Sequence, residues 1–380
     1  MIPLAVPNLT GNEKKYLDDC INTTFVSSVG EYVNRFEEMV ANATGSKYAV
    51  ATSSGTTGIH VALTAAGVMR DELVIIPSFT FIASANAVSH CGALPWLMDV
   101  CEHDWCLDPE TVRREIASNC ENHDEALFHK KTGKRIAALM PVYTLGNIPD
   151  MTAFREIADE YRIPLIVDAA CAIGATFSDK PFGDLADLSV LSFNGNKTIT
   201  CGGGGAVVGN NEKLLDHVRH LTTTARVWPD YDFDEVGYNY RMTNIQAAVG
   251  CAQMEQLDRF IMAKRHVRKY YEENLHSLTN KGVSFFPTAE GSSCWFSGIV
   301  LPKKTAIGRV KEICESLKAN GIEARPFWKP VHLQTPYRQV PIGTIVTTET
   351  LWQRIITLPC STGITDKDLD QVIKTLSKYI

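Results

Sequence analysis

Short apolar runs and longer amphipathic stretches alternate along the chain between about residues 45 and 210. Runs rich in β-branched residues predict buried strands, and an apolar residue at every third or fourth position predicts a helix. The predicted strands lie at residues 48–52, 73–77, 93–100, 136–142, 164–168, 189–191 and 206–208. The predicted helices lie at residues 57–68, 82–90 and 150–161, with Asp150 placed to cap the last of them. Strands that alternate with helices predict an α/β fold with a mostly parallel central sheet flanked by helices.

The last third of the chain has a different pattern. A long helical pattern runs from Thr243 towards Leu278, with Lys and Arg dominating the faces outside its apolar stripe. Beyond it, the predicted strands lie at residues 296–301 and 322–325, and the predicted helices at 304–320 and 366–379. We therefore expect a large domain over residues 1–250 and a smaller α+β domain over residues 251–380.

Composition narrows the class of protein. The chain has 380 residues, 45% hydrophobic and 21% charged, and a net charge of -6 gives no support for nucleic-acid binding. The N-terminal residues do not resemble a signal peptide, and no apolar run approaches the roughly 20 residues that span a bilayer. The 11 cysteines are dispersed without a C-x-x-C pair, and the histidines lack metal-ligand spacing. We expect a cytoplasmic protein with reduced thiols and no metal site.

Four features fall where strands should end, and ligands bind beyond the carboxyl ends of parallel strands. The turn at Ser53–Gly58 precedes a helix and can hold a phosphate, although a plain capped turn explains it equally well. Asp168 ends a strand, with a helix N-cap as its alternative role. Phe81 can stack on a planar ligand or pack in the core. Lys197 lies between two predicted strands beside four glycines. A shielded lysine suits Schiff-base chemistry, whereas a solvated loop lysine is the ordinary alternative.

Together these features meet the needs of one cofactor, pyridoxal 5'-phosphate (PLP). It needs a lysine for its aldehyde, an acid for its ring nitrogen, a stacking surface and a phosphate cradle. A metal or nicotinamide site does not explain all four features as simply.

Six motifs, which span nearly the whole chain in order, make the assignment specific. They are Ser54–Thr57, Pro77–Phe81, Val167–Ala170, Ser192–Lys197, Gly237–Met242 and Arg325–His332. Jointly they resemble the DegT/DnrJ/EryC1/StrS family of sugar aminotransferases, within fold-type I of the PLP enzymes (aspartate aminotransferase-like). Three further segments resemble the branch that acts on UDP-linked 4-keto-6-deoxy-N-acetylhexosamines in bacillosamine and legionaminic acid biosynthesis. They are Phe25–Val33, residues 194–205 and Thr222–Arg226.

The resemblance implies a role for each matching residue. Lys197 is expected to bond to the cofactor aldehyde and to move protons, Asp168 to keep the ring nitrogen protonated, and Phe81 to stack on the ring. The residues expected to bind the cofactor phosphate are Thr56, Thr57 and Ser192, with Asn239 and less directly Arg241 reaching it from the neighbouring subunit. A homodimer with shared active sites follows. The candidates for the nucleotide diphosphate and sugar are Arg226, Arg325 and His332, with surface ion pairing as their alternative role.

One position departs from the family pattern. Related enzymes usually carry Gln, His or Glu three residues after the acid, facing the ring oxygen of the cofactor, whereas this chain has Cys171. A thiol is a weak hydrogen-bond donor, so the substrate is less certain than the cofactor. Related sugar dehydratases replace the lysine with histidine, so Lys197 favours transamination.

The expected reaction therefore moves an amino group from L-glutamate to C4 of a nucleotide-linked 4-keto-6-deoxy sugar. The best match is a UDP-linked N-acetylhexosamine. The alternatives are a GDP- or dTDP-linked keto sugar, a PLP-dependent dehydratase or lyase, and a regulatory protein that kept the fold.

Overall fold

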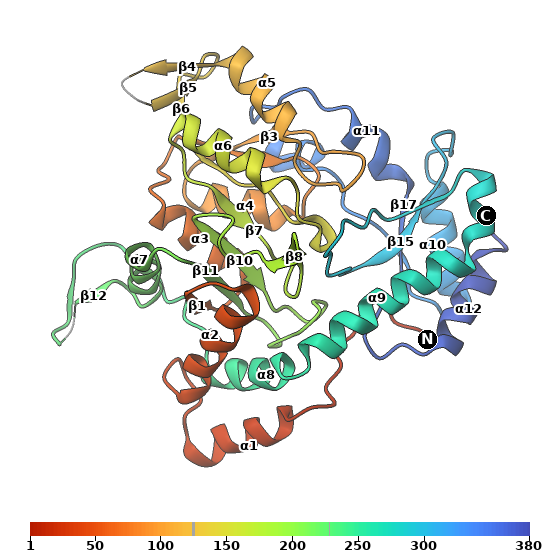
Figure 1. Ribbon diagram of the computed structural model, residues 1–380, viewed down its shortest axis with the longest axis horizontal. Helices are drawn as coiled ribbons and strands as arrows, with labels where there is room; N and C mark the ends of the chain where they lie inside the picture. The colour runs from red at the N-terminus through yellow and green to blue at the C-terminus, as the bar shows by residue number, and fades with distance from the viewer. Residues whose placement is uncertain (124–125, 228) are drawn as a thin grey trace.

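A seven-stranded sheet forms the centre of the larger part of the molecule (Figure 1). The computed structural model describes residues 1–123, 126–227 and 229–380. The strands, in spatial order, are β1 (Tyr48–Thr52), β11 (Gly205–Gly209), β10 (Leu188–Ser192), β7 (Ile166–Asp168), β6 (Lys134–Leu139), β2 (Leu73–Pro77) and β3 (Leu94–Met98). Two parallel bridges, Leu139–Leu165 and Val142–Asp168, join the β1 side of this sheet to the β3 side.

The strand directions confirm the mostly parallel sheet. Pairs β10–β7, β2–β6 and β2–β3 are parallel, whereas β11 runs antiparallel to both β1 and β10. An antiparallel extension carries β5 (Ala126–His129) and β4 (Cys120–His123) beyond β6. Every residue of β2 is buried, as expected for a strand covered on both faces.

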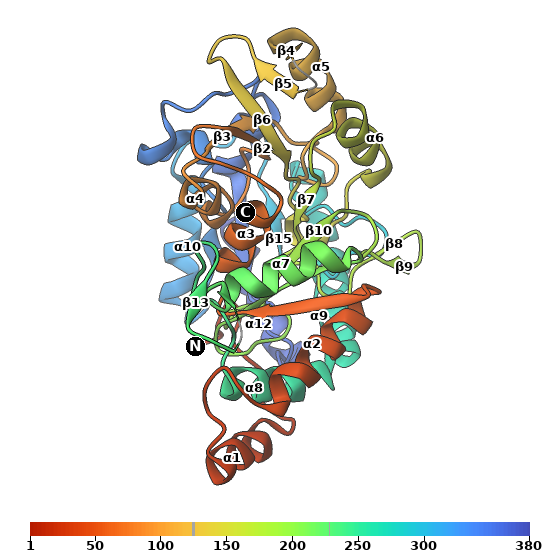
Figure 2. The ribbon, with the colours of Figure 1, turned by 90° about the vertical axis from the view of Figure 1, so that its left-hand side faces the viewer.

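Two layers of helices cover the sheet (Figures 1 and 2). Along β2, Leu73 and Ile75 belong to one apolar cluster and Val74 and Ile76 to the other, because successive side chains point to opposite faces. The helices of the first cluster are α2 (Glu31–Thr44), α5 (Pro109–Asn119), α6 (Met151–Tyr161) and α8 (Asn244–Met254), with α1 (Glu13–Thr23) packed on α8. The helices of the second are α3 (Gly55–Ala65), α4 (Ile82–His90) and α7 (Glu212–Thr222).

The predicted long helix after Thr243 is wrong in one respect. It is two helices, α8 and α9 (Leu257–Asn274), separated at Glu255 and Gln256 and followed by a 3-10 turn. The Glu255 carboxylate accepts hydrogen bonds from Tyr16 Oη and from Arg35 Nη2, both at 2.6 Å. These contacts hold the chain where the helix changes direction. Other predictions hold: α4 has the expected bounds, and Asp150 Oδ1 accepts from the Ala153 amide at 3.1 Å to cap α6.

The C-terminal part is an antiparallel sheet with helices, as expected for an α+β unit. Its strands, in spatial order, are β14 (Ser284–Phe285), β15 (Ser297–Val300), β17 (Ile355–Leu358) and β16 (Arg325–Pro326). Its helices are α9, α10 (Arg309–Ala319), α11 (Thr347–Leu351) and α12 (Asp366–Leu376). Ile2 and Leu4 pack in the same apolar cluster, and Ile2 forms a bridge with Ile322. The division after residue 250 stays a prediction.

The remaining elements are short. The hairpin strands are β8 (Thr176–Phe177) with β9 (Lys180–Pro181), and β12 (Arg226–Val227) with β13 (Asp232–Phe233). The 3-10 turns are Thr144–Gly146, His276–Lys281, Val331–Leu333, Thr335–Tyr337 and Trp352–Arg354. Across the described residues we find no helix with the length and apolar character needed to cross a membrane.

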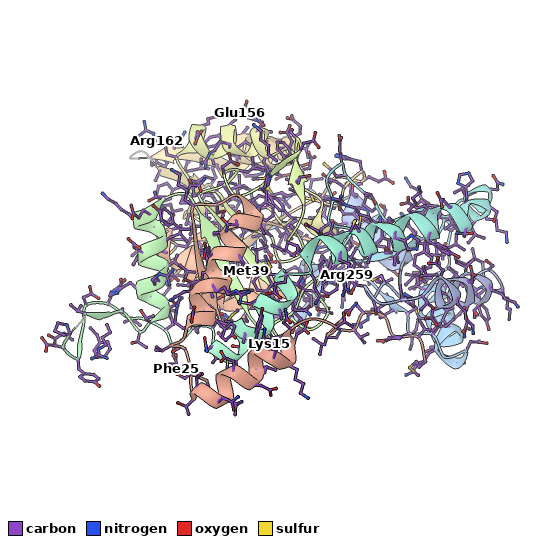
Figure 3. All side chains as sticks on the ribbon, turned by 60° about the horizontal axis from the view of Figure 1, so that its bottom comes forward. Lys15, Phe25, Met39, Glu156, Arg162 and Arg259 are labelled. Atoms are coloured by element: carbon purple, nitrogen blue, oxygen red, sulfur yellow. The ribbon has the colours of Figure 1, made fainter. Side chains whose placement is uncertain are left out.

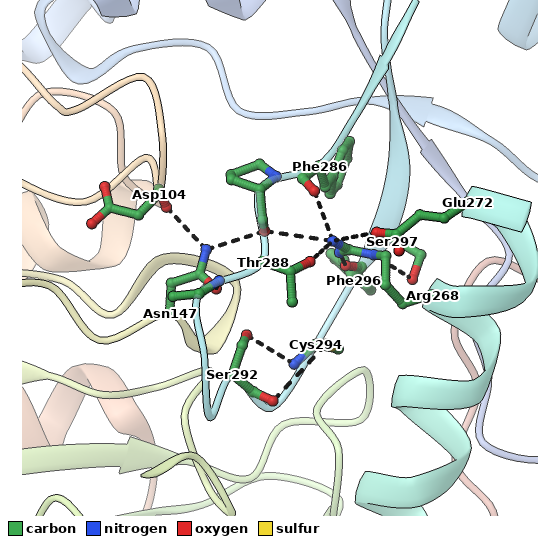
Figure 4. A network of polar contacts seen from close by, with 12 residues as sticks. Asp104, Asn147, Arg268, Glu272, Phe286, Thr288, Ser292, Cys294, Phe296 and Ser297 are labelled. Carbon is green, nitrogen blue, oxygen red and sulfur yellow. Dashed lines mark hydrogen bonds and ion pairs between the residues drawn. The ribbon is translucent and has the colours of Figure 1, made fainter. Parts of the chain in front are cut away.

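A buried arginine fixes the segment that leads into β15 (Figure 4). Arg268 on α9 is 3% exposed, and its guanidinium donates to the carbonyl of Phe286 at 2.8 Å. From the larger part of the molecule, the Asn147 amide donates to the carbonyl of Pro287 at 3.2 Å. Hydrogen bonds from both sides therefore hold the loop that carries Trp295 into the pocket described next.

Candidate active site

A pocket of about 380 Å³ lies at the carboxyl ends of β7 and β10, bordered by the N-terminal ends of α3 and α4 and by loops of the C-terminal part. This is the edge of a parallel sheet at which ligands are expected. It brings together seven of the predicted residues: Thr56, Phe81, Asp168, Cys171, Ser192, Lys197 and Arg325. Four others, Thr57, Arg226, Asn239 and His332, lie outside its lining.

Lys197 extends its amine into this pocket from the turn that follows β10. The turn is closed by a hydrogen bond from the Lys197 amide to the carbonyl of Asn194 at 3.0 Å. Lys197 is half-buried, and its Nζ lies 3.3 Å from Cys171 Sγ and 3.9 Å from the ring centroid of Trp295. The amine thus lies in the pocket between a thiol and an aromatic face.

Asp168 forms the buried acidic wall of the pocket and is 5% exposed. Its Oδ2 accepts from Ser84 Oγ at 2.7 Å, and its Oδ1 accepts from the Ala170 amide at 3.0 Å. Burial raises the pKa of this carboxyl group, while these hydrogen bonds and the charge of Lys197 act in the opposite direction. Sequence reasoning missed Ser84; a hydroxyl in the Ala-rich first turn after Phe81 was the available signal.

The N-terminal end of α3 shows how the two neighbouring threonines differ. Ser54 Oγ accepts from the Thr57 amide at 3.1 Å, and Thr57 Oγ1 accepts from the Ser54 amide at 3.0 Å. These reciprocal bonds form a capping box, so both polar groups of Thr57 serve the helix end. Gly55 and Thr56 instead line the pocket at the positive end of the helix dipole, where an anion is stabilised.

A glycine allows this helix end to lie against the sheet. A Cβ atom on Gly205, the first residue of β11, would lie 2.6 Å from the carbonyl carbon of Ser54. This atom belongs to the backbone, so it cannot move away without distorting the start of α3. The glycine run next to Lys197 is thus partly explained by the close approach of β11 to the N-terminal end of α3.

Aromatic side chains form another part of the pocket lining. Phe81 is 54% exposed, and its ring centroid lies 6.2 Å from that of Trp328, which stacks on Phe327 at 4.3 Å. Trp295 Nε1 donates to the carbonyl of Asn196 at 2.8 Å, which ties the C-terminal part to the turn of the lysine. Trp295 was missed because this contact joins positions about 100 residues apart, and no local pattern reveals it.

Cys171 faces the pocket as a neutral thiol. It is buried, and burial raises the pKa of its thiol above the ordinary value although the neighbouring Lys197 lowers it. The Cys171 carbonyl accepts from Ser293 Oγ at 2.7 Å, which fixes this turn against the C-terminal part. The position where related enzymes carry Gln, His or Glu therefore presents a weak S–H donor.

The other three predicted residues outside the lining have different surroundings. His332 is held away from the pocket: Nδ1 lies 2.6 Å from Ser78 Oγ, Nε2 lies 2.8 Å from Glu349 Oε1, and the side chain is 8% exposed. Both of its ring nitrogens are thus engaged within the fold. Asn239 and Arg226 line a second pocket of about 400 Å³, together with Ser28, Thr222–Thr224 and Arg241.

The main pocket fits PLP. It supplies an amine, a buried carboxylate, a helix N-terminal end and an exposed aromatic face around one cavity. These are the groups that bind the aldehyde, ring nitrogen, phosphate and ring face of this cofactor.

Comparisons with known proteins agree with this chemistry. The model of the DegT/DnrJ/EryC1/StrS aminotransferase family matches residues 7–377. The chain therefore belongs to this family of PLP-dependent sugar aminotransferases, with the fold expected from its sequence motifs.

Three relatives illustrate the range of the family. A GDP-perosamine synthase of Caulobacter vibrioides is 37% identical over 385 residues, covering 100% of this chain and 98% of the relative. The UDP-4-amino-4,6-dideoxy-N-acetyl-beta-L-altrosamine transaminase of Campylobacter jejuni is 30% identical over 353 residues, covering 91% and 89%. The structure of DesI in the presence of its TDP-sugar product is 27% identical, with a TM-score of 0.85, covering 99% of this chain and 91% of DesI.

Proposed function

We propose that this enzyme transfers the amino group of L-glutamate to C4 of a GDP-linked 4-keto-6-deoxy sugar. The observation that carries this proposal is the single pocket in which Lys197, Asp168 and the N-terminal end of α3 meet. PLP bound there supplies an aldehyde that carries the amine and a ring that delocalises electrons. The exchange of an amine for a ketone needs no external oxidant or reductant.

In this proposal each residue acts on one part of the reaction. The Lys197 amine, free in the pocket once the donor has bound, takes a proton from the donor carbon and returns one to the acceptor carbon. Asp168 holds a proton on the ring nitrogen. Its carboxylate is buried, so the attraction between it and the protonated ring is stronger than in water. Thr56, Ser192 and the α3 amides bind the phosphate, and Phe81 orients the ring. Arg325, exposed at the rim, meets the diphosphate.

The choice of GDP as the nucleotide of the substrate rests on a comparison of two relatives. A relative named for a GDP-linked product is 37% identical over the whole chain, whereas the relative named for a UDP-linked product is 30% identical over 91% of it. This favours GDP over the UDP-linked N-acetylhexosamine that the sequence motifs suggested. The UDP-linked sugar stays the second candidate, supported by the Campylobacter jejuni relative.

We further propose a homodimer in which each chain completes the pocket of its partner. Asn239 and Arg226 line a polar pocket away from Lys197, so in one chain they are not positioned to meet the same cofactor. Ser28 lines that pocket too, and beside it Phe25, Val26 and Val29 are 54%, 41% and 69% exposed. Figure 3 shows Phe25 at the outside of the molecule beside α1. Exposed apolar residues beside a polar pocket support an interface there.

The direct test gives the PLP-loaded full-length protein L-glutamate and a GDP-, UDP- or dTDP-linked 4-keto-6-deoxy sugar in turn. We expect 2-oxoglutarate and a 4-amino sugar in equal amounts, with the highest kcat/KM for the GDP-linked substrate. Lys197→Ala is expected to abolish both products, because among the described residues that line the pocket no other lysine offers an amine for the proton transfers. Lys213→Ala, an exposed lysine on α7, is the matched control and should retain activity.

Three outcomes would contradict the proposal. Loss of water from the sugar without 2-oxoglutarate would favour the dehydratase or lyase, and no reaction with bound PLP would favour a regulatory role. A higher kcat/KM for the UDP-linked sugar would return the assignment to the second candidate.

A cytoplasmic location stays a further proposal, supported by the free state of all eleven cysteines.

A further inference from the structure

The hairpin β12–β13 forms an arm, described at residues 226–227 and 229–233, that extends from the body of the molecule beside α7 (Figure 1). Its two strands share two pairs of residues, and Tyr231 and Phe233 on it are 80% and 55% exposed. Such a small hairpin is at best marginally stable without further support. What holds the base of the arm is therefore important for the residues that it carries.

The base of the arm is held by histidines of α7. His220 Nε2 lies 2.6 Å from Asp234 Oδ1 and 3.8 Å from Glu235 Oε1, and His217 Nε2 lies 2.9 Å from the same Glu235 oxygen. One ligand atom from each of His220, Asp234 and Glu235 lies within 4.8 Å of the others. Two adjacent carboxylates repel one another unless positive charge lies between them.

We propose that His220, Asp234 and Glu235 bind a zinc ion that fastens the arm to α7. One imidazole nitrogen and two carboxylate oxygens are ligands that Zn²⁺ accepts, and a water completes a tetrahedral site. Zinc bonds of about 2.0–2.1 Å place tetrahedral ligand atoms about 3.3 Å apart, so the observed 2.6 and 3.8 Å need shifts below about 1 Å. His217 hydrogen-bonds to Glu235 and orients that ligand.

The site is accessible from solvent. The side chains of His220, Asp234 and Glu235 are 28%, 58% and 38% exposed, which leaves a path for the ion. The sequence led us to expect no metal site, because Asp234 and Glu235 lie 14 or more positions beyond the histidines.

A second group of residues is a weaker candidate and provides the contrast. Cys101, His103 and Asp104 also place three ligand atoms within 4.8 Å. Burial and nearby carboxylates raise the pKa of Cys101 to about 12, and burial raises that of Asp104. At neutral pH the Cys101 thiol therefore keeps the proton that a metal ligand must release.

Zinc at the arm has a structural consequence. Arg226 begins the arm, with its guanidinium carbon 4.0 Å from the ring centroid of Tyr231 and its Nε donating to the carbonyl of Asp230 at 3.0 Å. A metal at Asp234 and Glu235 fixes the return strand at its base and thereby limits the positions that Arg226 reaches. Zinc binding should thus restrict the motion of the arm.

The test titrates ZnCl₂ into the metal-free, PLP-loaded full-length protein by calorimetry, with MgCl₂ as a control ion. We expect one zinc per chain with a dissociation constant below ~10 µM, and no binding of Mg²⁺, which prefers oxygen ligands. His220→Gln should remove binding, and His217→Gln should weaken it about 10–100-fold. His266→Gln, from an exposed pair in which His266 lies 2.8 Å from Asp366, should leave it unchanged.

A second readout follows the arm itself. Zinc should slow limited proteolysis within residues 226–233 at least fivefold in the unmodified protein and not in His220→Gln. The absence of zinc binding, or equal binding by His220→Gln and the unmodified protein, would overturn the site. Binding without protection would overturn the fastening of the arm. None of these readouts depends on transaminase activity, so they are independent of the proposed function.

Discussion

Asp168 combines a buried position with an expected need for negative charge. Asp168→Asn should lower kcat by ~10²–10³, because an amide cannot hold a proton on the ring nitrogen by charge. The free energy of unfolding of the apoenzyme should not fall. Burial raises the pKa of this acid, so its ionised form disfavours the folded state above the ordinary pKa. Steady-state kinetics and urea denaturation measure both effects, with exposed Asp184→Asn as the control. An unchanged kcat would refute the assigned role.

The hydrogen bond from Ser84 lowers the pKa of Asp168. Ser84→Ala removes the 2.7 Å hydrogen bond to Oδ2, so burial is less compensated and the pKa of Asp168 rises further. A carboxyl group with a higher pKa becomes neutral sooner as the pH falls. We therefore expect the acid limb of the kcat/KM–pH profile to move to higher pH.

The matched control for this prediction lies on the same helix. Ser89→Ala removes a hydroxyl that lies 3.2 Å from Tyr337 Oη, outside the pocket, and should leave the acid limb in place. If the two variants give the same profile, the hydrogen bond of Ser84 does not tune Asp168.

At the residue scale, the sequence identifies the groups that stand at strand ends. Lys197 and Asp168 were found because a parallel sheet gathers its carboxyl ends at one edge. Ser84 and Trp295 were not found, because their contacts with Asp168 and with the lysine turn arise from packing between distant segments. His332 shows the opposite case: a motif position that the fold uses for internal hydrogen bonds.

At the scale of elements, β11 lies against the N-terminal end of α3 at the glycine run that follows Lys197, and the glycines of this run differ in how closely they approach other atoms. Gly205→Ala should lower the free energy of unfolding by about 1–3 kcal/mol and weaken PLP binding, because its Cβ would press on the Ser54 backbone. Gly203→Ala is the matched control: its Cβ would approach only the Gln246 amide nitrogen, at 3.4 Å. Urea denaturation and PLP absorbance titration measure the two effects. Equal losses in both variants would mean that close approach of β11 to α3 is not the cause.

The elements themselves were largely predictable, because strand runs and helix periods are local properties of the sequence. The break between α8 and α9 was not. It depends on Glu255 contacts with Tyr16 and Arg35, more than 200 positions away along the chain. The capping box at the start of α3 is local, and a capped turn was one of the two roles left open for this segment. Thr57, expected at the phosphate, serves the helix cap in the structure.

At the scale of the whole molecule, two predicted site residues, Asn239 and Arg226, lie outside the main pocket of their own chain. The family resemblance placed Arg226 at the substrate and Asn239 at the cofactor phosphate of the neighbouring subunit, and the single chain places both around another cavity. A sequence does not specify which surfaces of two chains meet, so this part of the site could be expected only through family resemblance. A dimer that brings the second cavity of one chain to the main pocket of the other would reconcile both observations.

Mixing two defective variants tests this arrangement. Lys197→Ala lacks the amine, and Asn239→Ala should bind PLP weakly because it deprives the partner's pocket of a phosphate contact. In a mixed dimer, one pocket combines the intact Lys197 of one chain with the intact Asn239 of the other. If subunits exchange at random, activity should recover to about a quarter of the unmodified level, because half the dimers are mixed and each has one complete site. Lys197→Ala mixed with Asp168→Asn is the matched control and should recover nothing, since both residues line the pocket of their own chain. Full activity of Asn239→Ala alone, or no recovery on mixing, would show that the active sites are not shared.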